Sequence, residues 1–129
     1  MHSGKVTTRM IGDLGEAAVC RHLRLRGYRI LARNFTVKGG EIDIVAKRFS
    51  HLAFVEVKTR KADTDREKYG RPADAVDHEK RTNLRYAATR YLALHPVKAK
   101  PRFDIAEVTY TLREGKKPKL SLVYRKEAF

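Results

Sequence analysis

Hydrophobic and polar residues follow two different periods along the chain, and these periods predict its elements. Apolar residues three and four positions apart predict helices over residues 11–26 and 77–94. Short runs rich in Val, Ile and Phe are typical of strands, and we expect strands at residues 28–35, 41–46, 52–59, 102–112 and 119–125. The resulting order, α-β-β-β-α-β-β, predicts an α/β fold with one central mixed five-stranded sheet flanked by helices.

The remaining segments divide the chain into one domain and two polar stretches. Residues 1–10 predict a flexible N-terminus, and residues 11–129 a single domain. Residues 60–75 carry many charges and no large aliphatic side chain. We expect a mobile loop there, which would close on nucleic acid or mediate a dimer, with plain disorder as the alternative. Asp74 or Asp77 would cap the second helix.

Carboxylates stand inside two of the predicted strands, where apolar side chains would be expected. Asp43 lies in the second strand and Glu56 in the third. If these strands pair as a hairpin, the two residues become cross-strand neighbours with Cβ atoms about 4.5–5.5 Å apart. Two carboxylates at that distance repel each other unless they are protonated or bridged by a cation. Oxygen ligands suit a hard divalent ion, so we expect Mg²⁺ or Mn²⁺.

The alternation of side chains across a strand predicts which residues share the acidic face. Asp43 would share its face with Glu41 and Val45. Lys58 would share the face of Glu56, within reach of a metal-bound water or a phosphate oxygen. The opposite face of the second strand would be apolar and carry Ile42, Ile44 and Ala46.

Glu16 adds a third carboxylate from a distant segment. It falls inside the apolar stripe of the first helix, the face that should pack on the sheet. Gly12 and Gly15 would allow a close approach of that helix, and Cys20 on the same face would be a small core residue. Two alternatives remain open. The strand carboxylates could form structural salt bridges with basic neighbours, and Glu16 could be a surface residue.

Charge and composition narrow the class of partner. The chain has 29 Lys and Arg against 15 Asp and Glu, a net charge of +14. Such a balance favours a polyanion, and we expect nucleic acid rather than an acidic membrane surface, with improved solubility as the alternative explanation. A single cysteine, no apolar run near the ~18 residues of a membrane span and no signal-peptide core predict a cytoplasmic protein.

The acidic residues also match a known pattern. Asp43, then twelve residues, then Glu56-Val57-Lys58 resembles the PD-(D/E)XK nuclease signature, with Ile42 where that signature usually has proline. Most of the chain resembles the YraN-like family of small bacterial proteins. The matching stretches are residues 12–18, 33–35, 40–46, 54–60, Lys80 and 102–104. This resemblance implies a restriction-endonuclease-like fold, similar to archaeal Holliday-junction resolvases.

The resemblance also implies roles for the acidic cluster. Asp43 and Glu56 would hold the metal, together with the Val57 carbonyl, and Glu16 would complete or orient the site. Lys58 would position the attacking water or stabilise developing negative charge. These four side chains, Glu16, Asp43, Glu56 and Lys58, are the predicted catalytic residues.

Other residues are predicted to support the site or to contact phosphate. Glu41, Thr59, Arg60 and Lys80 form this set, although Glu41 could be a solvated strand start and Thr59 and Arg60 plain surface residues. Asp104, inside a strand, is expected to form a structural salt bridge with an arginine.

The acidic cluster, the charge and the resemblance together predict a metal-dependent nuclease that hydrolyses phosphodiester bonds of nucleic acid, with DNA favoured over RNA. The resemblance to resolvases makes structured or branched DNA a candidate substrate, which the sequence by itself does not select. The resolvase resemblance implies a homodimer. The alternative is a nucleic-acid-binding module of the same fold that does not cut. A third hypothesis, a structural or assembly protein, predicts no salt-dependent affinity for DNA.

Overall fold

The computed structural model describes residues 6–62 and 78–129, and its elements follow the predicted order. The helices are α1 (Thr8–Leu25) and α3 (His78–Leu94). The strands are β1 (Arg29–Val37), β2 (Gly40–Arg48), β3 (His51–Lys61), β4 (Lys100–Arg113) and β5 (Lys116–Arg125). The predicted α/β class, with one mixed five-stranded sheet, is confirmed.

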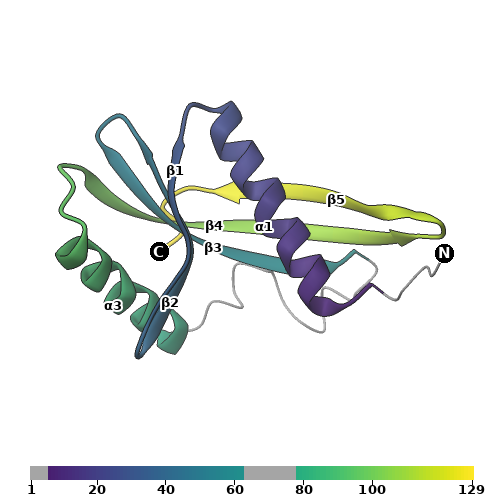
Figure 1. Cartoon of the computed structure of the whole chain (residues 1–129), viewed down its shortest axis with the longest axis horizontal. Helices are drawn as coiled ribbons and strands as arrows, with labels where there is room; N and C mark the ends of the chain where they lie inside the picture. Colours follow the sequence, from purple (N-terminus) through teal and green to yellow (C-terminus); the bar gives the residue numbers. More distant parts are fainter. Residues whose placement is uncertain (1–5, 63–77) are drawn as a thin grey trace.

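The strands form one open sheet in the order β1-β2-β3-β4-β5. Neighbouring strands are antiparallel except β3 and β4, which run parallel. A parallel pair needs a long crossover connection, and the connection from β3 to β4 contains α3. Figure 1 shows α1 lying across the sheet and α3 running beside β2.

The two helices cover opposite faces of the sheet, and each face has its own apolar core. On β3, Ala53 and Val55 belong to the cluster that includes Val19 of α1. Leu52 and Phe54, which alternate with them along the strand, belong to the cluster packed against α3. We call these the α1 face and the α3 face. Because side chains alternate along β3, Glu56 and Lys58 lie on the α3 face.

The first helix begins earlier than its apolar periodicity predicts. It starts at Thr8 rather than at Ile11, because the Thr7 hydroxyl accepts a hydrogen bond from the Met10 N–H at 3.1 Å and caps the first turn. Gly15 is buried against the sheet, as predicted. Gly12 is not part of the close approach, since a Cβ built there would contact nothing within 4 Å.

The predicted alternation of side chains along β2 is wrong for Ile42, which precedes Asp43. Ile44 and Ala46 share the α1 face, in agreement with the predicted alternation, but Ile42 packs on the α3 face. The break lies opposite Asn34 of β1, which stands between the residues that pair with Ile42 and Ile44 and has a left-handed backbone with φ of 53°. Asp43 therefore sits where the strand changes faces.

The predicted loop at residues 60–75 begins later than the sequence pattern indicates. Arg60 and Lys61, placed at the start of the predicted loop, belong to β3. The rest of that loop and the predicted caps Asp74 and Asp77 lie almost wholly outside the described residues. Within the described part of the chain, no helix is long and apolar enough to cross a membrane.

Candidate metal centre

Asp43 and Glu56 come together where the ladder between β2 and β3 ends. The paired positions run from Arg48 and His51 to Ile44 and Val55, one residue short of the two acids. Beyond that point a side chain takes over from the backbone as the hydrogen-bond acceptor for β3. The Asp43 Oδ2 accepts a hydrogen bond from the Val57 N–H at 2.8 Å. This bond fixes the Asp43 carboxylate beside the backbone of β3.

The proximity of the two carboxylates changes the protonation of Asp43. Burial, the largest effect, and the negative charge of Glu56 together raise the pKa of Asp43 to about 7. The Val57 N–H acts in the opposite direction, while Glu16 adds a further increase in that pKa. Near neutral pH the Asp43 carboxyl is therefore partly protonated, and a bound cation would displace its proton.

Two lysines complete the cluster. The Glu56 Oε2 lies 3.0 Å from the Lys80 Nζ and 3.6 Å from the Lys58 Nζ. Lys80 comes from the first turn of α3, so the helix crossover delivers it to the α3 face of β3. Burial, followed by the nearby Lys80, lowers the pKa of Lys58. For Lys80, burial is outweighed by hydrogen bonds with Lys58 and Glu56, and its pKa is raised.

Glu16 lies close to the cluster but is engaged elsewhere. Its Oε1 is 3.3 Å from the Arg33 Nη2, and its side chain is only 14% exposed. Its charge still contributes to the raised pKa of Asp43. Among residues 6–62 and 78–129, no group of three or more His, Cys, Asp and Glu side chains is placed to hold a metal ion.

The supporting residues separate into two groups. Lys80 reaches the cluster, whereas Thr59 lies on the other side of the sheet. A Cβ built on Gly15 of α1 would be 2.8 Å from the Thr59 Oγ1, which places this hydroxyl on the α1 face. Glu41 is exposed at the start of β2. Arg60 is partly buried near the end of β3, past the cluster.

Asp104 forms the predicted salt bridge and anchors a buried polar network. Its carboxylate accepts hydrogen bonds from the Arg102 guanidinium at 2.9 Å, the Tyr124 hydroxyl at 2.5 Å and the Glu127 N–H at 3.0 Å. Arg102 also donates to the Tyr28 hydroxyl at 2.6 Å. This network ties β4 to both edges of the sheet and satisfies the buried charges.

Sequence comparisons place the chain among known proteins. A profile of the family described as "Uncharacterised protein family UPF0102" matches residues 15–108, which include both carboxylates and both lysines of the cluster. The chain belongs to this family.

Individual UPF0102 relatives cover most of both chains. A UPF0102 protein of Parafrankia sp. is 44% identical over 81% of this chain and 86% of its own length. Relatives from Symbiobacterium thermophilum and Alkaliphilus metalliredigens are 42% and 39% identical, each over 78% of this chain and over 83% and 86% of their own lengths. The resemblance to the YraN-like family is thereby confirmed.

The UPF0102 fold also buries an acid that sequence reasoning missed. Glu107 on β4 is buried, pairs in register with Lys58 and forms an ion pair with Arg125. The signal that identified Asp43, a carboxylate inside an apolar strand, is equally present at Glu107. Its position beside Lys58 extends the row of alternating charges across the α3 face.

Proposed function

We propose that this UPF0102 protein hydrolyses phosphodiester bonds of nucleic acid at the Asp43–Glu56 pair, with a bound Mg²⁺ or Mn²⁺. The observation that carries the proposal is the held proximity of the two carboxylates. Asp43 is fixed by the Val57 N–H and has its pKa raised to about 7 by burial and by Glu56. Perturbed carboxylates of this kind are concentrated at functional sites.

The donor set fits a hard divalent cation. Asp43 and Glu56 offer carboxylate oxygens, and Mg²⁺ is commonly held by one or two carboxylates together with waters and substrate phosphates. When bound, such an ion neutralises charge on a phosphate and lowers the pKa of a coordinated water. Glu56 would have to exchange an ammonium partner for the ion. Lys80 can leave, because its side chain is 47% exposed.

The two lysines would supply positive charge beside the phosphates of a nucleic acid, which the carboxylates alone would repel. Lys58 is the more buried of the two, and its ammonium is held 3.6 Å from Glu56. It would donate a hydrogen bond to a phosphate oxygen as negative charge develops there. Lys80, released from Glu56, would pair with a neighbouring backbone phosphate.

Calorimetry with Mg²⁺ and Mn²⁺ tests the site directly. We expect the wild-type protein to bind the ion and Glu56→Gln to bind it at least about tenfold more weakly, since it loses a charged ligand. Glu41→Gln is the matched control, because it removes the same charge from an exposed position on β2. Cleavage of branched, nicked and single-stranded DNA is then compared among the three proteins. A wild-type protein that binds neither ion would refute the proposal.

A non-cleaving nucleic-acid-binding module is the second candidate. The observation that favours it is the pairing of the acids with cations, Glu56 with two lysines and Glu16 with Arg33. Such a module would bind DNA with strong salt dependence. It would show no calorimetric binding of Mg²⁺ or Mn²⁺ and would leave branched, nicked and single-stranded DNA uncut in the presence of either ion.

A further inference from the structure

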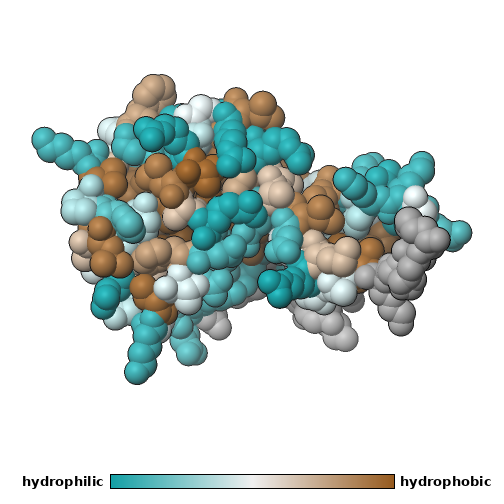
Figure 2. All heavy atoms as spheres, viewed as in Figure 1, coloured by the Kyte–Doolittle hydropathy of each residue, from teal (hydrophilic) through white to brown (hydrophobic). Residues whose placement is uncertain are grey.

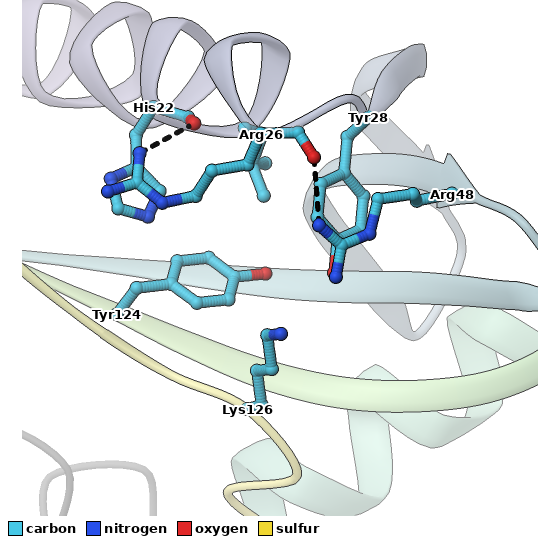
Figure 3. Close-up of a pocket in the computed structure, with 7 residues that line it drawn as sticks. His22, Arg26, Tyr28, Arg48, Tyr124 and Lys126 are labelled. Carbon is cyan, nitrogen blue, oxygen red and sulfur yellow. Dashed lines mark hydrogen bonds between the residues drawn. The ribbon is translucent and has the colours of Figure 1, made fainter.

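A pocket lined by basic and aromatic side chains opens on the α1 face, at the end of the sheet where α1 is followed by β1. It has a volume of about 470 Å³. Figure 3 shows Tyr28 and Arg48 on one side of it and Tyr124 and Lys126 on the other, below the last turn of α1. The residues that matter for its chemistry are His22, Arg26, Tyr28, Arg48, Tyr124 and Lys126.

The pocket collects basic groups from three separate segments. His22 and Arg26 come from the end of α1, Arg48 from the end of β2 and Lys126 from just after β5. Among residues 6–62 and 78–129, none of these four forms an ion pair with a carboxylate. Asp104, which accepts a hydrogen bond from the Tyr124 hydroxyl, is fully buried and already paired with Arg102 within its own network. The pocket therefore presents uncompensated positive charge.

The two guanidinium groups of the pocket, those of Arg26 and Arg48, are held in place by contacts that use only some of their N–H donors. The Arg48 Nη1 donates to the Arg26 carbonyl at 2.8 Å, and its guanidinium lies 4.6 Å from the centre of the Tyr28 ring. The Arg26 Nη1 donates to the His22 carbonyl at 3.2 Å. A guanidinium carries five N–H donors, so both groups keep several for a ligand. Positioned donors of this kind suit the oxygens of a phosphate.

The helix dipole explains only part of this cluster. Cations near a helix C-terminus offset its partial negative charge, which accounts for Arg26. Burial, followed by the nearby Arg26, lowers the pKa of His22, so this imidazole lines the pocket mainly as a neutral ring. The dipole does not account for Arg48 and Lys126, which the fold brings in from β2 and from beyond β5. The aromatic walls, with His22 stacked on Tyr124 at 5.4 Å, are also suited to a nucleotide.

We propose that this pocket binds a phosphate group, carried by the backbone of a nucleic acid or by a free nucleotide. It is separate from the acidic cluster. Arg48 lies five residues from Asp43 along β2, about 17 Å away, and the pocket opens on the α1 face whereas Glu56 lies on the α3 face. The assignment to nucleic acid rests on the proposed function, whereas the phosphate chemistry of the pocket does not.

The test compares two charge-matched double variants in buffer with EDTA, so that the metal centre plays no part. Arg26→Ala/Lys126→Ala removes two exposed cations of the pocket, and Lys117→Ala/Lys119→Ala removes two exposed cations from the far end of β5. Binding of a labelled single-stranded oligonucleotide is measured by anisotropy, and binding of a nucleoside monophosphate and of inorganic phosphate by calorimetry. Thermal melting verifies that both variants are folded.

We expect the pocket variant to bind the oligonucleotide about fivefold or more weakly than the wild-type protein, and the control less than about twofold more weakly. Loss of nucleotide and phosphate binding alone would support the pocket with a free nucleotide as its ligand. Equal binding by the two variants in every assay would overturn the proposal. Because no metal is present, failure of the nuclease proposal leaves these outcomes unchanged.

Discussion

Asp43 is held in a position that costs the fold stability. Its pKa in the folded chain is about 7, against an ordinary value of 3.8, and burial is the largest cause. A carboxyl group with a raised pKa stabilises the fold fully below its unfolded pKa, and this contribution is lost as the pH rises through the folded pKa. The destabilisation caused by ionising Asp43 therefore grows between about pH 4 and pH 7 and persists above pH 7, and a bound cation would remove it.

Replacing Asp43 by asparagine should make the metal-free protein more stable at pH 8. The amide keeps an acceptor for the Val57 N–H but has no charge to desolvate. We expect a gain of about 1–4 kcal/mol in the free energy of unfolding, since one pKa unit corresponds to about 1.4 kcal/mol. Urea denaturation at several pH values in EDTA measures it.

The difference between Asp43→Asn and wild type should grow from pH 4 to pH 7 and then level off. Glu41→Gln, two residues away and exposed, should show no comparable trend. A difference independent of pH would mean that Asp43 titrates normally in the folded chain. Added Mg²⁺ should stabilise the wild-type protein but not the Asp43→Asn variant.

At the scale of elements, one glycine sets how closely α3 approaches the sheet. A Cβ built on Gly40 at the start of β2 would be 2.4 Å from the Asn83 carbonyl oxygen and 3.0 Å from the Ala87 Cβ. Backbone cannot move aside as a flexible side chain can. The same helix carries Lys80 to Glu56, so the contact at Gly40 also positions the cluster.

The substitution Gly40→Ala should therefore destabilise the fold by about 1–3 kcal/mol, because it forces α3 away from β2. Gly12→Ala is the matched control. Gly12 lies in the interior of α1 with nothing within 4 Å of a built Cβ, and removal of a helical glycine should stabilise by about 0.5–1 kcal/mol. The urea midpoint should fall for Gly40→Ala and rise for Gly12→Ala. A rise of the same size in both variants would show that Gly40 has room for a methyl group.

At the scale of the whole molecule, positive charge is spread over both faces of the sheet. The net charge is +14, and Figure 2 shows hydrophilic side chains over much of the face that it displays, with apolar ones scattered between them. Lys58 and Lys80 stand on the α3 face, and the phosphate pocket stands on the α1 face. A bound nucleic acid would have contacts on two sides of one thin domain.

Binding to single-stranded DNA in EDTA should weaken by at least about tenfold between 50 and 200 mM salt, because phosphate contacts release counterions. The slope of log affinity against log salt should fall by about 1 for each phosphate contact that a variant loses. The pocket double variant should show this change, and the Lys117→Ala/Lys119→Ala control should not. Affinity independent of salt would instead favour a structural or assembly role.

The chain encodes most of the architecture in local patterns. Period-two runs and apolar stripes were sufficient to predict every described helix and strand in order, because each element must bury one face. The same patterns marked Asp43, Glu56 and Lys58 as unusual. They missed Glu107, which carries the same signal in β4, and they placed the start of α1 three residues late because Thr7 was not recognised as its cap.

The sequence by itself determined the order of elements, the sheet and the presence of acids within its strands, since these follow from local periodicity. Only the tertiary structure decided which charges meet. Lys80 reaches Glu56 because the crossover through α3 folds it back, and Glu16 turns to Arg33 rather than joining a three-carboxylate group. Ile42 lies on the unexpected face, next to the break in β2 that stands opposite the left-handed backbone of Asn34. Strand alternation assumes regular geometry, and a single residue outside it reverses every assignment beyond that point.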